Sequence, residues 1–600
     1  MICVDSNTNN HNEGGVDNST SFNTTTTTTT TATTTGSSSP LGTSVESLTD
    51  YITKKNKKKS IKEHQRKKSY FLSTWLFLKI LSTVTFIAFF SAVIQVKGLI
   101  GDDGILPVSS VLEAKVSSKE INSIWILFIH PTKGMGWSVN DVLHGLCCVG
   151  LIFSSLSLFM TTTATYIGIM WFCYYCIVDV GQVFYSYQWD QLLLETLFLA
   201  IFFSPFNHFK YDDKPSTPIR YLLKWLLFRL MFGSGLVKLT PIWAGLQAMI
   251  YHYETQCIPN VFSWYFHQLP PLYHQFETMM VLAIEILLPP LYFAPRLFRI
   301  FASLVTIVFQ LGIALTGNYN FFNYLTMGLC VLLLDDAFLL GFFFPGKFKH
   351  KLLEIESKRM KSIQQDRQAD QRQEFSLSNI NSKNLLVPFV FILVGTSSLY
   401  NTTRYFQKQT TPLLITRIHS ALSLYHLTGT YGLFSHVSVE RFEIIIEGSY
   451  DGETWSEYEF YYKPGNLSRH PPFVFPGHKP RLDWQMWFAA LSKDYRSQPW
   501  LIHFMARLLQ GTPEVHSLIE YSPFPLDKPP LYIRAQKYKY YFTKWKGGNI
   551  DIGVDNDSQW WSRDLVGTFV NSFSLDSLFY KSFILQNNII KEKEKNNMNN

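Results

Sequence analysis

The apolar segments of this 600-residue chain carry ionisable side chains whose chemistry needs an explanation, foremost Asp190, Glu195, Arg229, Lys238, Glu285, Asp335 and Asp336. A charge inside a bilayer is costly, so it must pair with an opposite charge or serve catalysis or transport. Arg229 and Glu285 each lie about ten residues into their segment, which places both near the midplane and allows them to pair. Asp190 and Lys238 are expected nearer one face. We expect these charges to fix helix packing, with a catalytic or transport role as the alternative.

The seven cysteines offer a second possible chemistry. Cys173 and Cys176 have the spacing of a thioredoxin-like redox pair. They lie inside an apolar segment without a strand-helix-strand context, which favours two small packing residues instead. No His/Cys group has metal-ligand spacing, and the sequence contains no phosphate loop or G-x-S-x-G motif. We therefore expect no metal, no cofactor and no catalytic residue.

The elements that must position these charges are apolar. Hydrophobic residues make up 46% of the chain and charged residues only 16%, which is typical of a membrane protein. Several apolar segments are shorter than the roughly 20 residues that a helix needs to cross the hydrocarbon. We expect about nine spans, near residues 71–96, 141–160, 163–186, 190–206, 220–239, 274–294, 300–316, 320–344 and 385–400.

Two basic stretches set the expected orientation. Lys54–Lys68 and Lys347–Arg372 are typical of cytosolic loops that flank spans, and neither belongs to a nucleic-acid-binding motif. The N-terminus is therefore expected in the cytosol and the chain after residue 400 in the lumen. Glycosylation acceptors agree weakly, because Asn401, Asn466 and Asn556 all lie on the expected lumenal side. Asn18 and Asn23 match the same pattern but should stay unmodified in a cytosolic tail.

The expected domain organisation follows from these patterns. The N-terminal tail has no apolar leader, so the first span is expected to be an uncleaved anchor. The segments are a disordered Asn/Ser/Thr-rich and basic cytosolic tail (1–69), a multi-span membrane region (70–346), a charged cytosolic loop (347–383), a last span (384–400), a lumenal β-rich domain (401–585) and a polar tail (586–600).

The expected lumenal domain is mostly β with some helix. Residues 441–462 alternate and contain Asp451-Gly452, which predicts a β-hairpin. Residues 484–509 read as helical with Pro499 dividing two pieces, and residues 531–543 return to strand alternation. No cysteine lies in this domain, so it is expected to fold without disulfides.

Ordered blocks across residues 70–565 resemble the lipase maturation factor family. They include Gly98–Pro107, Trp189–Glu195, Arg229–Lys238, Glu254–Asn260, Ser263–Pro270 and Gly317–Thr326, the lumenal stretches GSYDGETW, YKPGNLSRHPPFV and RLDWQMWFAAL, and Trp560–Arg563. The resemblance implies a multi-pass protein of the endoplasmic reticulum membrane that helps secreted lipases fold, assemble and leave. The C-terminus carries no KDEL-type signal, so the means of retention is open.

Client binding would require exposed aromatic and arginine side chains, which dominate binding energy at interfaces. The candidates are Tyr458, Phe460, Tyr461, Arg481, Trp484 and Trp487. Each has a competing interpretation as a core residue, because most aromatics of a β domain are buried. The alternative functions are an intramembrane enzyme distantly similar to vitamin K-dependent carboxylases, through Trp189–Glu195 and the Arg229 block, and a transporter or scaffold.

Overall fold

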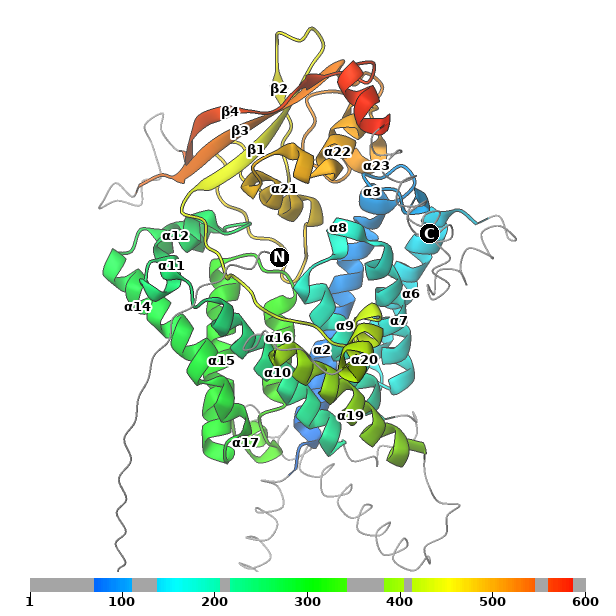
Figure 1. The fold of residues 1–600 in the computed structure, drawn as a ribbon, viewed down its shortest axis with the longest axis vertical. Helices are drawn as coiled ribbons and strands as arrows, with labels where there is room; N and C mark the ends of the chain where they lie inside the picture. The colour runs from blue at the N-terminus through cyan, green and yellow to red at the C-terminus, as the bar shows by residue number, and fades with distance from the viewer. Residues whose placement is uncertain are drawn as a thin grey trace, which may run out of the picture. The chain divides into compact units, whose positions relative to one another are not determined.

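The computed structural model describes residues 69–110, 137–205, 216–342, 382–403, 413–544 and 559–585. The expected N-terminal tail, charged loop and polar C-terminal tail lie outside these residues, apart from residues 69, 382 and 383. So does Asn556. The described residues form a helical region up to Thr403 and a C-terminal part from Leu413 (Figure 1).

The helical region forms from the apolar segments of the sequence. Its elements are α2 (Phe71–Val93), α3 (Val96–Ile100), α6 (Val139–Phe159), α7 (Ala164–Val180), α8 (Gln182–Tyr185), α9 (Gln188–Phe203), α10 (Thr217–Val237), α11 (Pro241–Ala244), α12 (Ala248–Thr255), α13 (Val261–His267), α14 (Pro271–Leu282), the π-helical turn η1 (Ala283–Leu287), the 3-10 turn η2 (Pro289–Phe293), α15 (Arg296–Thr316), α16 (Phe322–Val331), α17 (Asp336–Phe342) and α19 (Ser382–Thr403).

Polar side chains cap the starts of α2, α6 and α13. Ser138 and Asp141 form a reciprocal capping box at the start of α6, and Asn260 and Ser263 do the same for α13. The start of α2 is capped from a distance, because Asp336 accepts hydrogen bonds from the backbone N–H groups of residues 71, 72 and 73. A carboxylate in the first turn also interacts favourably with the helix dipole.

The expected count of about nine spans is not confirmed. All nine apolar segments are helical, but within the described residues four helical stretches are long and apolar enough to cross a membrane: Phe71–Val93, Val139–Phe159, Pro271–Phe293 and Arg296–Thr316. A fifth is possible if α16 and α17, which are bent by 112°, count as one. The segments α7 and α9 have 17 and 16 residues, which is short for a crossing.

The C-terminal part contains a four-stranded antiparallel sheet of order β2-β1-β3-β4. Its elements are α20 (Leu413–Leu424), β1 (Arg441–Ser449), β2 (Ser456–Glu457), α21 (Arg481–Leu491), the 3-10 turn η4 (Tyr495–Ser497), α22 (Pro499–Leu509), α23 (Pro513–His516), β3 (Tyr532–Phe542) and β4 (Trp561–Phe573). The predicted hairpin, the two helices divided at Pro499 and the strand at 531–543 are confirmed. The sheet is small and shares its core with helices, so the expectation of a mostly β domain holds only in part.

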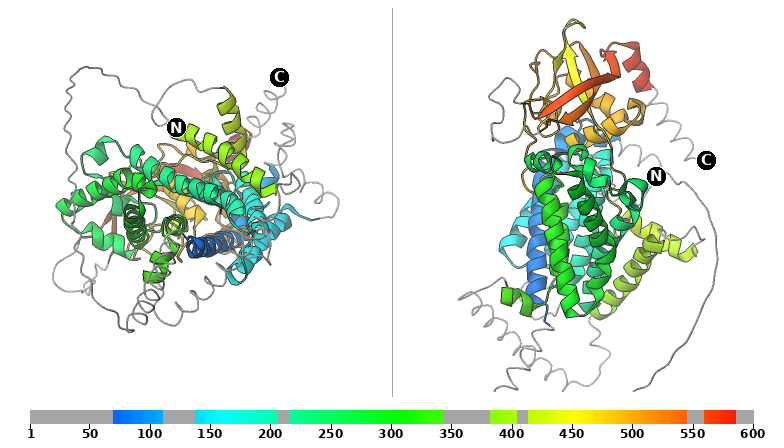
Figure 2. Two further views of the ribbon diagram at one scale, coloured as in Figure 1. Left: turned by 90° about the horizontal axis from the view of Figure 1, so that it is seen from below. Right: turned by 90° about the vertical axis from the view of Figure 1, so that its left-hand side faces the viewer.

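Strand β1 is buried on both faces. Ile444 and Ile446 belong to the large core that also contains residues of α21, while Ile445 packs with Trp561 and the half-buried Trp264 of α13. In Figure 1 the strands lie at one end of the helices, with α21 between the sheet and the helical region, and the side view agrees (Figure 2). The sheet is therefore packed onto the helices.

Residues 425–440, here called the linking segment, connect α20 to β1. The segment runs across the helices before it reaches the sheet (Figure 1). His426 and Phe434 adopt positive φ angles of 52° and 57°, which are uncommon for residues other than glycine. Such backbone persists where surrounding contacts fix it, and the contacts of this segment lie next to the ionisable residues of the helices.

Candidate functional site

Three buried ion pairs connect the helices to one another and to the C-terminal part. They are Asp190–Arg481, Glu195–Arg229 and Glu285–Lys238, and together they are called the ionic seam. All six residues are buried. Buried charges of this kind require partners and hydrogen bonds for every polar atom, because desolvation is otherwise too costly.

Asp190 pairs with a residue nearly 300 positions away in the sequence. The Nη1 and Nη2 atoms of Arg481 lie 2.9 and 2.8 Å from the two carboxylate oxygens of Asp190, and Tyr174 donates a third hydrogen bond at 2.6 Å. Arg481 also donates to the carbonyl oxygen of Phe184 at 2.6 Å. Burial acts to lower the pKa of Arg481, but Asp190 more than compensates and the pKa is raised above its usual range. This pair fastens α21 to α9.

Lys479 lies beside this pair and was not singled out from the sequence. It is fully buried, and its Nζ lies 2.9 Å from the centroid of the Tyr187 ring, 4.1 Å from that of Trp189 and 3.9 Å from an Asp190 oxygen. Among the described residues this Nζ finds no hydrogen-bond acceptor. Burial lowers the pKa of Lys479 well below its usual range, with Asp190 opposing the shift.

Glu195 and Arg229 pair directly, and the linking segment adds further hydrogen bonds to both side chains. The backbone N–H of Gly429 donates to Glu195 at 2.9 Å, and its carbonyl oxygen accepts from Arg229 Nη1 at 2.7 Å. The Tyr431 hydroxyl donates to Glu195 at 2.7 Å. The expected pairing of Arg229 with Glu285 is therefore wrong, because position along a helix sets depth but not which neighbouring helix a side chain faces.

Glu285 instead accepts from Lys238 at 2.6 Å. It is presented by the π-helical turn η1, a distortion that often accompanies functional sites. Lys238 also donates to the carbonyl oxygen of Leu433 at 3.0 Å, and the neighbouring Trp243 indole donates to that of Phe434 at 3.1 Å. The linking segment thus contacts the ion pairs of both Arg229 and Lys238, and no feature of its sequence predicted this insertion.

The sixth and seventh ionisable residues lie elsewhere. Asp336 caps α2, and Asp335 pairs with Arg296 at 2.6 Å. Among the described residues no group of three or more His, Cys, Asp or Glu side chains is placed to hold a metal ion. Cys173 and Cys176 are both buried in α7, and neither forms a disulfide with a described residue.

The client-binding candidates are mostly buried. Tyr458, Phe460 and Trp484 are 2–3% exposed and Arg481 is 1% exposed, so they form part of the core and the ionic seam. Trp487 is half-buried and donates to the carbonyl oxygen of Thr255 at 3.1 Å. Tyr461 is 40% exposed. Client contact through these six residues stays a prediction. In this conformation Tyr461 has the most exposed side chain of the six, so it is the residue best placed to touch a client.

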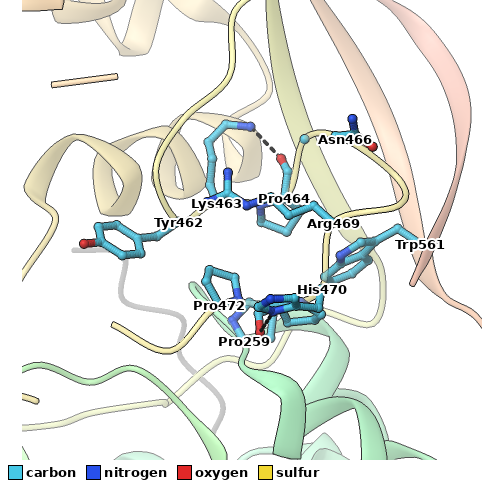
Figure 3. A pocket seen from close by; sticks show the side chains of 11 residues that line it. Pro259, Tyr462, Lys463, Pro464, Asn466, Arg469, His470, Pro472 and Trp561 are labelled. Carbon is cyan, nitrogen blue, oxygen red and sulfur yellow. Dashed lines mark hydrogen bonds between the residues drawn. The ribbon is translucent and has the colours of Figure 1, made fainter. Parts of the chain in front are cut away.

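A small cleft lies where the C-terminal part meets the helical region. Pro259 of the helical region faces Lys463, Pro464, His470 and Pro472 of the C-terminal part (Figure 3). The cleft has room for about one water molecule, which is too little for a peptide segment. Asn466 on its rim is exposed, as a glycosylation acceptor must be. The Asn401 side chain lies outside the described part of the structure.

Comparison with known proteins matches both parts of the chain. Residues 72–341 match the lipase maturation factor transmembrane domain, and residues 427–571 match the lipase maturation factor C-terminal domain. Lipase maturation factor 2 of Xenopus tropicalis is 34% identical over 86% of this chain and 84% of its own length. The chain belongs to the lipase maturation factor family.

Two human members of the family show the same extent of similarity. Human lipase maturation factor 2 is 34% identical over 83% of this chain and 82% of its own length, and human lipase maturation factor 1 is 33% identical over 86% and 90%. No solved structure matches the chain significantly. The C-terminal domain match begins at residue 427, so it includes the part of the linking segment that binds the ionic seam. The resemblance drawn from the sequence blocks is confirmed.

Proposed function

We propose that this chain is a multi-pass protein of the endoplasmic reticulum membrane that assists secreted proteins, lipases among them, to fold, assemble and be exported. The observation that carries the proposal is family membership, since relatives named lipase maturation factor align over more than four-fifths of the chain. The basic stretches favour a cytosolic N-terminus and a lumenal C-terminal part. In this arrangement the helices anchor the protein and the C-terminal part meets the client.

The ionic seam is better suited to stabilising a client-binding structure than to catalysis. Each seam carboxylate is neutralised by a cation, and both Asp190 and Glu195 accept further hydrogen bonds from tyrosine hydroxyls. A general base needs a free lone pair directed at a substrate proton. If the protein were an enzyme using Asp190 or Glu195 as a base, that carboxylate would have to give up its ion pair and hydrogen bonds. A protein that only binds clients needs these interactions to stay intact.

Tyr461 is the contact that we propose for clients within the set of aromatic candidates. Its ring is 40% exposed, and an exposed tyrosine offers a large apolar surface at low entropic cost. We expect Tyr461→Ala to lower the yield of active secreted lipase without changing the abundance of the variant. Tyr532→Ala, at a tyrosine of 38% exposure on β3, is the matched control and should leave the yield unchanged. Equal effects of the two variants would remove Tyr461 from the client surface.

The function itself is tested in cells that lack the chain. Secreted lipase specific activity and intracellular lipase retention are measured, with lipase synthesis and one secreted non-lipase glycoprotein as controls. We expect inactive lipase to accumulate inside the cells while the control glycoprotein leaves normally, because unfolded clients expose apolar surface and are retained. Normal lipase output would contradict the lipase assignment.

A further inference from the structure

A cluster of four cations lies at the end of the helical region away from the sheet. The Tyr70 ring, just before α2, has Arg220 Cζ at 3.6 Å, Arg299 Cζ at 5.6 Å and Lys224 Nζ at 6.0 Å from its centroid. Arg296, one turn before Arg299 on α15, completes the set. The start of α2 and α17 both lie at this end of the helices (Figure 1).

Two acidic residues neighbour the cluster, and both are already engaged. Asp336 accepts four hydrogen bonds, from the Ser69 hydroxyl and from the three backbone N–H groups that begin α2. Asp335 accepts from Arg296 Nε at 2.6 Å and Nη2 at 2.9 Å, and it also lies 3.7 Å from Arg299. Within the described residues neither Arg220 nor Lys224 forms an ion pair with a carboxylate, and Asp336 acts on Arg220 only through space.

Lys224 is almost fully withdrawn from solvent, whereas Arg220 is only partly buried. Lys224 is 4% exposed, and no hydrogen bond to its ammonium group is formed within the described residues. The Nε of Arg220 is buried and lacks a partner there as well. The Tyr70 ring face attracts cations but offsets little of the cost of holding the buried Lys224 ammonium beside a second cation. The cluster is thus built to receive an anion.

The position of the cluster indicates where such an anion comes from. Tyr70, Arg220 and Arg296 lie at or near the first residues of α2, α10 and α15, and both α2 and α15 are apolar enough to span a membrane. The ends of spans meet the headgroup layer, where phosphate groups lie at the same depth as the cluster. Arginine binds phosphate through parallel N–H donors, and lysine adds a point charge.

We propose that Arg220 and Lys224, flanked by Arg299 and Tyr70, bind the phosphate group of an anionic membrane lipid. The headgroup phosphate supplies the missing negative charge between α2, α10 and α15. The binding fixes the ends of these helices relative to one another. This site is independent of the client assignment, since it lies at the end of the helices away from the C-terminal sheet.

The test uses the full chain purified in detergent. Phosphatidate is titrated while thermal unfolding is followed, with phosphatidylcholine as the neutral lipid and inorganic phosphate as the soluble anion. We expect phosphatidate to raise the unfolding midpoint and native mass spectrometry to show one retained lipid. Arg220→Gln/Lys224→Gln should weaken this binding by about tenfold or more, since each charge-assisted contact is worth that order. Arg496→Gln/Lys493→Gln removes the same charge from the C-terminal part and should change nothing.

Lys224→Met is a second variant of the cluster, used in case Arg220→Gln/Lys224→Gln does not fold. It removes a buried charge while keeping a similar chain volume, so it should raise the unfolding midpoint without lipid and reduce the response to phosphatidate. A wild-type response in either cluster variant would overturn the proposal. An equal midpoint shift with inorganic phosphate would overturn the lipid as the source, and an equal shift with phosphatidylcholine would overturn the role of charge.

Discussion

Asp190 connects the helices to the C-terminal part through a single buried side chain. Its carboxylate binds Arg481 through two hydrogen bonds, and both residues are buried. Removing one member of a buried ion pair leaves the other charge uncompensated. Substituting one residue of the ionic seam is therefore expected to destabilise the fold more through the uncompensated charge of its partner than through the lost contact itself.

We predict that Asp190→Ala lowers the free energy of unfolding by roughly 3–5 kcal/mol, because Arg481 would stay buried without its counter-ion. Asp190→Leu/Arg481→Met replaces the pair by apolar side chains and should recover much of that loss. Thermal or denaturant unfolding in detergent measures both. Asp494→Ala is the control, since its pair with Arg496 is exposed and should contribute less than about 1 kcal/mol. Similar losses for Asp190→Ala and Asp494→Ala would contradict the buried pair.

His478 gives the C-terminal part a pH dependence. Burial, with Arg481 adding repulsion, lowers the pKa of His478 to about 4. Its unfolded pKa is about 6.5, so between these values the unfolded chain binds a proton that the folded chain does not. The stability that neutral His478 supports is present above about pH 6.5 and is lost as the pH falls toward 4.

We predict that the wild type loses roughly 2 kcal/mol more stability than His478→Gln between pH 7.5 and pH 5. Asp483, whose pKa burial raises to about 6, acts with the opposite sign but is present in both proteins and cancels. Unfolding free energies of both proteins at the two pH values measure the difference. A difference between them that does not vary with pH would show that His478 titrates normally.

At the scale of elements, α3 and α23 lie in close contact across the junction. A Cβ on Gly98 of α3 would lie 2.3 Å from the Glu514 carbonyl oxygen and 2.8 Å from Leu518 Cγ. Backbone cannot yield as a flexible side chain can, so the two helices would have to separate. The close approach of these elements therefore depends on glycine at this one position.

We predict that Gly98→Ala destabilises the protein by about 1–3 kcal/mol, which is the usual cost of overpacking. Gly145→Ala is the matched control, because Gly145 is also helical and nothing lies within 4 Å of its added Cβ. That control should be neutral or slightly stabilising, as alanine favours helix over glycine by up to about 1 kcal/mol. Thermal unfolding of the two variants, measured side by side, tests this prediction. Equal unfolding midpoints would show that α3 and α23 are free to move apart.

Elements were predictable from the sequence where their pattern is local. Alternation and Asp-Gly predicted the hairpin of β1 and β2, and Pro499 predicted the break between α21 and α22. The number of spans was not predictable, since α7 and α9 are helical and apolar but short. The partners of Arg229 and Glu285 were not predictable either, because they depend on which helices are neighbours and on the linking segment, whose Gly429 acts through its backbone.

At the scale of the whole molecule, the C-terminal part and the helices share one core and one set of buried charges. Leu482 and Met486 of α21 belong to the same buried cluster as residues of α2, α7 and α9. Gln95 near the end of α2 accepts from the Arg481 backbone N–H at 2.9 Å and donates to the Lys479 carbonyl oxygen at 2.9 Å. A client held by the C-terminal part would therefore be held by the membrane region as well.

The most direct test of this unity is to cut the chain and ask whether its parts stay together. A site-specific protease sequence is placed between Thr403 and Leu413, and the purified protein is cleaved to completion in detergent and passed over a sizing column. The ionic seam predicts that the fragment from residue 413 onward co-elutes with the helical fragment, and that Asp190→Ala/Glu195→Ala in the same chain releases it. Separation of the fragments in the cleaved wild type would contradict the account.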